Sequence, residues 1–300
     1  MDRLFVFNGL LCKFVSISVI VMSLKSALIS PAELQEALTK NDHLILLDCT
    51  IDKVGQSLKD APLELLPNSL FFDIEGKFSD PASKLPHTLV SEQVFQRGVR
   101  ALGVDQDSTV VLYDRWGIYS SPRGWWMFKV MGFNQVYILN GGLPAWKEAK
   151  YPLVNSYQEN IKKGNFEAHF QKNLYADKEY ILAHYRSSEV SIFDARSKGR
   201  FNGLVAEPRK GLNGGHIPHS RNLPFEEVLD GVCYKDVAEL KRQFEHFKTM
   251  EKEHVFTCGS GITASILAFA CYLSGQHNIR VYDGSWSEWG REELNLPTEK

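Results

Sequence analysis

Short apolar runs and amphipathic stretches alternate along the first half of the chain. Three runs of hydrophobic residues have the length of buried strands, at residues 44–48, 108–114 and 136–139. Apolar positions at helical spacing predict helices at residues 31–40, 91–101 and 122–131. Ser30 and Pro31 form a typical helix start before the first of these. Apolar strands that alternate with helices are typical of a parallel sheet covered on both faces, so the pattern predicts an α/β fold.

The second half of the chain repeats the first in the same order. Apolar runs at residues 190–194, 254–258 and 279–282 match the three runs above, and residues 216–222 match 65–71. All four matches have offsets between 143 and 151 residues. A repeat this long indicates two related domains, each a parallel sheet with helices on both faces. We expect these domains at residues 23–152 and 173–300, joined by a polar linker at residues 153–172.

Composition and charge describe an ordinary globular protein. Hydrophobic residues make up 44% of the chain and charged residues 23%, and the net charge of −2 offers no basic surface for nucleic acid. The five cysteines are odd in number and form no C-x-x-C pair, so neither a disulfide framework nor a zinc site is expected. Reduced cysteines are typical of a reducing compartment, and we expect a cytoplasmic protein.

The first 22 residues differ from the rest of the chain. Their apolar run at residues 14–22 is too short to span a bilayer, so no stable membrane span is expected. Arg3 and Lys13 precede the run. Three interpretations stay open: a signal-peptide core, a weak organellar presequence, or an extension ahead of a start at Met22.

Cys258 stands where a predicted strand meets a predicted helix. The apolar run before it leads into a Gly-rich turn, and an apolar helical pattern follows. Gly259 and Gly261 let the backbone curl around the sulfur, and the helix N-terminus favours an anion there. This setting favours a thiolate, so we interpret Cys258 as a nucleophile. A buried packing cysteine is the simpler alternative.

A cradled thiolate can serve three kinds of chemistry. Phosphate-ester hydrolysis needs an arginine six residues after the cysteine, where this chain has Ala264. Proteolysis needs a histidine base beside the thiol, and no local signature supports one. Sulfur transfer needs the thiolate to hold a second sulfur as a persulfide anion, which backbone N–H groups can stabilise. The residues favour sulfur transfer.

The loop at residues 258–263, Cys-Gly-Ser-Gly-Ile-Thr, closely resembles the active-site loop of the 3-mercaptopyruvate sulfurtransferases, in the rhodanese superfamily. The resemblance extends over residues 23–297. It implies that Cys258 takes sulfur from mercaptopyruvate, releases pyruvate and passes the sulfur to a thiol, thioredoxin or cyanide, without a metal or organic cofactor. Ser260 is expected to donate a hydrogen bond to the substrate. The other loop residues are expected to bind the substrate: Gly259, Gly261, Ile262 and Thr263.

A pair of arginines completes the resemblance. The family's G-R-F…E-P-R pattern stands here at residues 199–201 and 207–209, which implies that Arg200 and Arg209 bind the substrate carboxylate. A guanidinium group suits this role because its planar fork can donate two parallel hydrogen bonds. Arg196 lies outside the pattern and is interpreted as structural.

The repeat also indicates which domain carries the chemistry. Asp114 occupies the place of Cys258 in the first domain, and a carboxylate cannot hold sulfur as a persulfide. We therefore expect the first domain to be non-catalytic and to wall off the site. Trp116 and Trp286 are expected near the cleft.

Three further positions carry expectations. His216 is interpreted as a loop residue that fixes the backbone, although a general base is the alternative. Leu65 stands where the family usually has a first-domain histidine, so proton handling is expected to be slower or to use another group. Thr263 is expected to cap the helix after the loop.

Two alternatives to a mercaptopyruvate enzyme stay open. A thiosulfate sulfurtransferase would carry basic side chains directly after the cysteine, where this chain has Gly259 and Ser260. A non-enzymatic sulfur carrier or interaction module would not need Cys258, Arg200 and Arg209 together.

Overall fold

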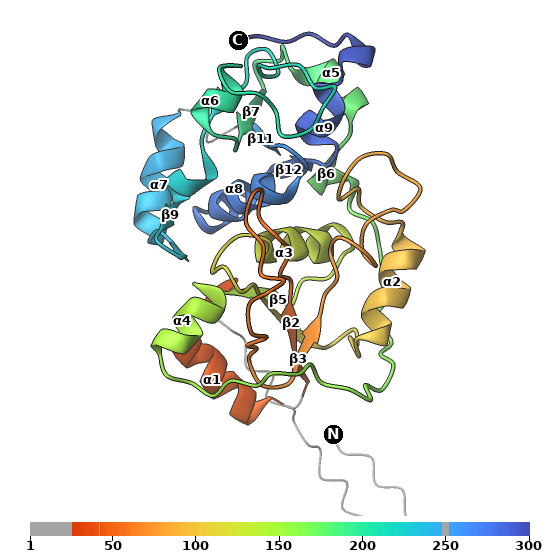
Figure 1. The fold of residues 1–300 in the computed structure, drawn as a ribbon, viewed down its shortest axis with the longest axis vertical. Coiled ribbons are helices and arrows are strands. Elements are labelled where there is room, and N and C mark those ends of the chain that lie inside the picture. Colours follow the sequence, from red (N-terminus) through yellow and green to blue (C-terminus); the bar gives the residue numbers. More distant parts are fainter. Residues whose placement is uncertain (1–25, 42, 248–251) are drawn as a thin grey trace, which may run out of the picture.

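The computed structural model describes residues 26–41, 43–247 and 252–300. The three interpretations of residues 1–22 lie outside this range. No helix in the described part is long and apolar enough to cross a membrane. Two five-stranded sheets, one in each half of the chain, form the framework (Figure 1).

The first sheet is parallel and has the strand order β1-β5-β4-β2-β3. Its strands are β1 (Leu28–Ile29), β2 (Leu44–Asp48), β3 (Ser69–Phe71), β4 (Thr109–Tyr113) and β5 (Val136–Leu139). The predicted apolar runs are its three central strands, and the short edge strands were missed. The run predicted at residues 108–114 is one residue longer than β4 at each end, where the polar residues Ser108 and Asp114 stand.

Helices cover both faces of this sheet, as predicted. They are α1 (Pro31–Lys40), α2 (Glu92–Ala101), α3 (Ser121–Val130) and α4 (Gly142–Glu148). Alternate residues of the strands face opposite cores: Leu46 and Val111 pack with α1 and α4, whereas Leu47 and Leu112 pack with α2 and α3. The start of α1 at Pro31 is confirmed by a capping box.

The second sheet repeats this topology with the order β6-β12-β11-β7-β8. Its parallel strands are β6 (Tyr175–Ala176), β7 (Val190–Asp194), β8 (Arg221–Asn222), β11 (Glu253–Thr257) and β12 (Ile279–Tyr282). The helices around it are α5 (Lys178–His184), α6 (Lys198–Phe201), α7 (Val237–His246), α8 (Ile262–Leu273) and α9 (Ser285–Trp289). A small antiparallel ribbon joins β9 (Leu229–Asp230) to β10 (Cys233–Tyr234). Single 3-10 turns lie at Lys172–Leu174, Phe225–Val228 and Glu292–Leu294. The identical strand order confirms the tandem repeat.

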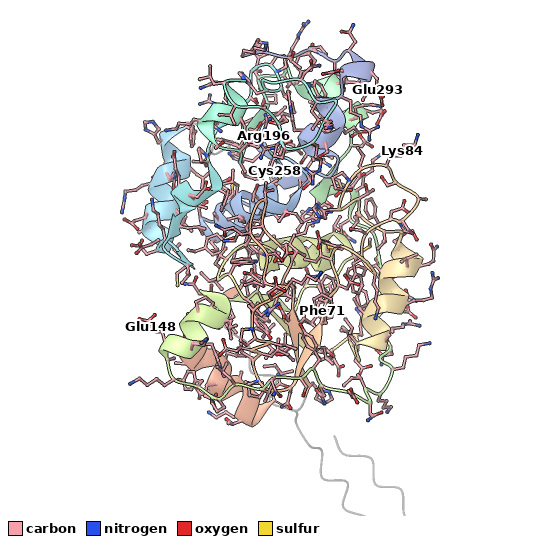
Figure 2. The ribbon with its side chains drawn as sticks, viewed as in Figure 1. Phe71, Lys84, Glu148, Arg196, Cys258 and Glu293 are labelled. Carbon is pink, nitrogen blue, oxygen red and sulfur yellow. The ribbon has the colours of Figure 1, made fainter. Side chains whose placement is uncertain are left out.

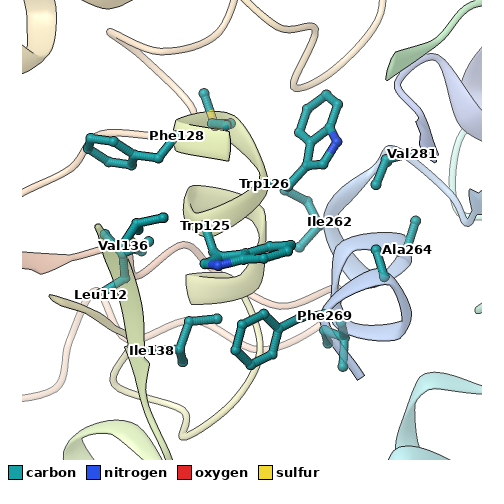
Figure 3. Packing of buried hydrophobic residues seen from close by; sticks show 14 of the residues in the cluster. Leu112, Trp125, Trp126, Phe128, Val136, Ile138, Ile262, Ala264, Phe269 and Val281 are labelled. Atoms are coloured by element: carbon teal, nitrogen blue, oxygen red, sulfur yellow. The ribbon is translucent and has the colours of Figure 1, made fainter. Parts of the chain in front are cut away.

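The two halves meet where α3 packs against α8 (Figures 1 and 3). Trp125 of α3 contacts Phe269 of α8, with ring centroids 4.8 Å apart in an edge-to-face arrangement. Ile262, at the start of α8, belongs to the same buried cluster (Figure 3). One apolar core thus spans both sheets, and it fixes the start of α8 against the first half of the chain.

The polar segment at residues 153–172 contains no helix or strand before the 3-10 turn at its end. It nevertheless packs on the first half of the chain. The Val154 and Leu65 backbones exchange hydrogen bonds of 2.9 Å, and the Gln158 N–H donates to Ser69 O of edge strand β3. Phe166 is fully buried. The segment therefore covers a sheet edge that would otherwise be open to pairing with another chain. The domain boundaries given above stay a prediction.

Candidate active site

Cys258 lies between the end of β11 and the start of α8, at the junction of the two halves (Figure 2). Gly261 has a φ of +81°, which an L side chain rarely adopts. This turn points the Gly261 N–H back at the Cys258 sulfur, at 3.1 Å. The Cys258 residue is only 2% exposed. The predicted curl of backbone around the sulfur is therefore present.

Helix α9 supports the loop from behind. The Cys258 carbonyl accepts a hydrogen bond from the Trp286 N–H at 2.9 Å, and the Gly259 carbonyl accepts one from Ser287 N–H at 2.9 Å. The Ser285 hydroxyl lies 3.2 Å from the Cys258 N–H, which donates to it. The carbonyl groups of Cys258 and Gly259 are therefore hydrogen-bonded to α9. Their negative ends point at this helix and not at the thiolate.

One of two expectations about neighbouring residues was wrong. Thr263 does not cap α8: the N-cap is Gly261, without a side-chain cap, and Thr263 lies within the first turn of the helix. Trp286 lies near the cleft as expected, since its N–H donates to the Cys258 carbonyl, but its side chain is fully buried and does not line the cavity. Its ring lies under the Arg196 guanidinium, 4.2 Å from the centroid, so it packs behind the site.

Two of the three arginines, Arg196 and Arg200, share the buried carboxylate of Glu207. Arg196 donates to both Asp194 and Glu207 and is fully buried, consistent with the structural role predicted for it. Arg200 donates to the other oxygen of Glu207 at 2.5 Å and keeps 21% of its side chain exposed. Glu207 therefore orients Arg200 and is also paired with a second cation, Arg196. The Arg209 Nη1 lies 3.4 Å from the Ser287 hydroxyl of α9.

The structure brings the predicted loop and arginine residues to one cavity of about 200 Å³. The second half of the chain contributes Arg200, Pro208, Arg209, Cys258, Gly259, Ser260, Ile262 and Thr263. The first half contributes Ile51, Asp52, Lys53, Val54, Glu75, His87 and Tyr119. Gly259 borders Arg200 closely, since a Cβ at 259 would lie 3.1 Å from its Nη2. Of the site residues predicted from the sequence, Gly261 alone is absent from this lining, and its N–H reaches the sulfur from behind.

A histidine that was not predicted from the sequence lies beside the loop. His87 Nδ1 lies 2.9 Å from the Ser260 hydroxyl, and His87 Nε2 lies 3.4 Å from Glu75 Oε1. Burial and the charges of Cys258 and Asp114 raise the pKa of Tyr119 to about 12, so its hydroxyl remains a proton donor at neutral pH. His87 has a φ of +58°, a strained conformation for a non-glycine residue. No sequence motif surrounds His87, so nothing in the sequence marked it as a site residue. Its left-handed backbone is visible only in the structure.

A buried ion pair ties His87 to the second half of the chain. Arg123 of α3 donates to Asp283 Oδ1 at 2.5 Å and to the His87 carbonyl at 2.6 Å. Asp283 also accepts from the Leu89 N–H at 2.9 Å. Arg123 is completely buried and Asp283 is 2% exposed. These contacts clamp residues 87–89 against the active-site half of the chain.

Asp114 sits in the first half's counterpart of the Cys258 loop. Its Oδ2 accepts hydrogen bonds from the N–H groups of Tyr119, Ser120 and Ser121 at 2.9–3.0 Å. Its Oδ1 accepts from the Trp116 N–H at 3.1 Å. The carboxylate fills an anion cradle of the same kind and is fully buried, so solvent and substrate do not reach it.

His216 and Leu65 lie away from the cavity. The His216 ring stacks on Phe201 with centroids 3.7 Å apart, and its Nδ1 lies 2.9 Å from the Phe201 carbonyl. These contacts hold the loop after α6, which is the backbone-fixing role expected of it. Leu65 is buried against the polar segment. In the part of the chain that the structure describes, no three His, Cys, Asp or Glu side chains are grouped as metal ligands would be.

This site on a duplicated sheet fold defines a class of protein. The chain matches the rhodanese-like domain twice, at residues 30–149 and 177–292, and it belongs to the rhodanese family.

Among its relatives is the 3-mercaptopyruvate sulfurtransferase of Escherichia coli K12, 36% identical over 85% of this chain and 91% of that protein. Another is thiosulfate/3-mercaptopyruvate sulfurtransferase 1 of Arabidopsis thaliana, 35% identical over 83% of this chain and 71% of that protein. The crystal structure of SseA from Escherichia coli aligns with a TM-score of 0.77 at 31% identity, covering 88% of this chain and 100% of that one. The protein is a sulfurtransferase enzyme, which sets aside the carrier-module alternative.

Proposed function

We propose that the protein transfers sulfur from 3-mercaptopyruvate, through a persulfide on Cys258, to an acceptor such as a small thiol, thioredoxin or cyanide, and releases pyruvate. The observation that carries this proposal is the shared cavity. A sulfur held by a backbone N–H donor lies in one small cavity with Arg200 and Arg209. A 2-oxo acid with a terminal thiol matches that pairing of nucleophile and carboxylate binders.

The donor half-reaction balances without any further reactant. The Cys258 thiolate attacks the substrate sulfur, a sulfur–sulfur bond forms, and the carbon–sulfur bond breaks. The carbon takes the electron pair as the enolate of pyruvate. The proton that leaves the substrate thiol ends on this carbon, which gives pyruvate. The outer persulfide sulfur then carries the negative charge.

The side chains of Ser260, His87 and Glu75 form a series of hydrogen bonds along which the proton of the substrate thiol can move in this step. These contacts of 2.9 and 3.4 Å join a hydroxyl at the loop to a carboxylate that is partly open to solvent. In our proposal Ser260 donates to the substrate, and His87 exchanges the proton through it. This gives the first half of the chain a direct part in the reaction, through a residue other than the family histidine replaced at Leu65.

The arginines orient the donor in this proposal. Arg200 is held by Glu207, so its planar group is preorganised and loses little freedom on binding a carboxylate. Arg209 makes no ion pair among the described residues. Its charge is therefore available to the substrate.

The first half of the chain contains no nucleophile in this proposal, because Asp114 stands there at the position that corresponds to Cys258, and it takes part only through His87. We also propose the domain division at residues 153–172 and a reducing compartment such as the cytoplasm. The four described cysteines are free, as a persulfide enzyme that meets thiol acceptors requires.

A single-turnover experiment tests the function. Enzyme mixed with excess mercaptopyruvate, without an acceptor, should release about one pyruvate per active site and gain one sulfur on the Cys258 peptide by mass spectrometry. C258S should do neither, because a hydroxyl cannot hold a sulfane sulfur. Sulfur on Cys49, Cys233 or Cys271 would contradict the site. Faster persulfide formation from thiosulfate than from mercaptopyruvate would favour the thiosulfate alternative.

A further inference from the structure

A second, larger cavity adjoins the one that holds Cys258. It measures about 590 Å³. The two cavities share five lining residues: Lys53, Val54, Tyr119, Arg200 and Thr263. They are therefore neighbours on either side of these residues, and the donor proposed above uses only the smaller one.

Lys53 stands on the boundary between the two cavities. Its ammonium lies 4.8 Å from the ring centroid of Trp116 and 4.9 Å from that of Tyr119. The aromatic faces hold the cation without neutralising it. Burial lowers the pKa of Lys53, while the charges of Asp114 and Glu226 act in the opposite direction. Burial of a cation that keeps its charge favours an anionic partner at this place.

The acidic groups around Lys53 are otherwise engaged or exposed. Asp52 accepts hydrogen bonds from the Ser57 hydroxyl and the Leu58 N–H, which turn it toward its own loop. Asp114 is held by four backbone N–H groups, and Glu226 is exposed. Within the described residues Lys53 forms no ion pair, whereas Arg200 is paired with Glu207.

Trp116 and Tyr119, which form an aromatic shelf under Lys53, are held in place by hydrogen bonds. Trp116 Nε1 donates to the Ile51 carbonyl at 2.8 Å, and the Trp116 and Tyr119 N–H groups both donate to Asp114. Asp114, through its hydrogen bonds, thus fixes Trp116 and Tyr119, and both of these residues line the second cavity. Since Ile51 also lies two residues before Lys53, the shelf and the cation form one unit.

We propose that this second cavity is the sulfur-acceptor site, and that Lys53 makes it select thiols that carry a carboxylate. The inference rests on the persulfide of the proposed function. The acceptor thiolate attacks the outer sulfur of the Cys258 persulfide, the new sulfur–sulfur bond forms as the old one breaks, and Cys258 leaves as a thiolate. Lys53 binds the acceptor's carboxylate during this step. It belongs to the first half of the chain and lines the second cavity, whereas Arg209 lines only the smaller one.

Ping-pong kinetics allow the acceptor step to be measured alone, because kcat/KM for the acceptor reports only the second half-reaction. The acceptors are 3-mercaptopropionate, 2-mercaptoethanol and cysteamine, which are anionic, neutral and cationic thiols of similar size. Each acceptor is compared with itself in wild type and K53M. Differences in thiol reactivity therefore cancel.

K53M should lower kcat/KM for 3-mercaptopropionate about fivefold, the effect of losing one partly exposed charge contact. The value for 2-mercaptoethanol should change little, and that for cysteamine should rise. K53E should reverse the order of the anionic and cationic thiols. K59M is the matched control: Lys59 is exposed in the same loop, lines neither cavity, and its loss should leave all three ratios unchanged.

Equal changes with all three thiols in K53M, or the same changes in K59M, would overturn the inference. So would a loss confined to kcat/KM for mercaptopyruvate, since Lys53 would then bind the donor. The proposed function fails separately: in that case wild type treated with mercaptopyruvate would carry no sulfur on Cys258.

Discussion

At the scale of single residues, the arginine pair offers the sharpest test of donor choice. Arg200 and Arg209 line the cavity with Cys258. R200A and R209A should each lower kcat/KM for mercaptopyruvate about 10- to 150-fold, the loss of a charge-assisted hydrogen bond of about 1.5–3 kcal/mol. Thiosulfate has no carboxylate and should lose far less. Lysine at either position should restore only part of the activity, because it lacks the planar fork.

Arg242 supplies the control for these variants, because it is exposed on α7 and does not line the cavity. R242A should leave both donors unaffected. Equal losses with both donors in R200A and R209A would mean that the arginines act through the fold or the general field, and not on a carboxylate.

The contact between Ser260 and His87 predicts a second behaviour at this scale. S260A and H87A should each lower kcat/KM for mercaptopyruvate on the order of 100-fold, as loss of a proton-transfer group does. Because Ser260 and His87 transfer the proton together in our proposal, removing either one removes the function of both. The double variant should therefore be no slower than the slower single variant. A double-mutant cycle in single-turnover pyruvate release measures this. Losses that multiply would show that the two residues act independently.

At the scale of elements, the turn from β11 into α8 depends on a left-handed residue. Gly261 has a φ of +81°, and a Cβ there would lie 2.9 Å from Arg123 Nη1. G261A should cost about 1–2 kcal/mol in urea unfolding for the backbone conformation alone. It should also lower activity strongly, because shifting this turn moves the N–H that donates to the Cys258 sulfur.

Gly211 separates the two effects. Its φ is +75°, yet a Cβ there would meet nothing within 4 Å. G211A should show a similar loss of stability with nearly unchanged turnover. If both variants lost activity in proportion to stability, the Gly261 N–H would have no specific part in the reaction.

At the scale of the whole molecule, the Arg123–Asp283 pair joins the two halves and holds His87 in place. R123M should lower the free energy of unfolding by about 3–5 kcal/mol, because it leaves Asp283 buried without its partner. It should also slow the donor half-reaction, since the His87 segment loses its anchor. R123M/D283L should recover much of the stability and little of the activity.

The exposed pair of Lys40 and Glu36 on α1 is the control for this prediction. K40M should cost less than about 1 kcal/mol, as expected for a surface ion pair. Recovery of full activity in R123M/D283L would show that the clamp contributes stability alone and does not position His87.

The sequence by itself determined the architecture and the loop that surrounds Cys258. Apolar runs such as residues 44–48 encode buried strands because every side chain in them needs a covered face, and their repetition after 146 residues encodes a second sheet of the same order. The Gly-rich turn after Cys258 is local, so its spacing was sufficient to predict the loop around the sulfur. Short edge strands such as β1 escaped prediction because two residues carry no periodicity.

Only the tertiary structure decided what faces Cys258 from the other half of the chain. His87 and Ser260 are 173 residues apart, and Arg123 and Asp283 are 160 apart. Their meeting depends on the packing of α3 against α8 and on the path of the irregular segment at residues 79–90, neither of which has a local signature. The same holds for Lys53, whose position over Trp116 follows from a loop held by the buried Asp114. Local pattern encodes burial and backbone shape, whereas contacts across a domain interface arise only when the whole chain has folded.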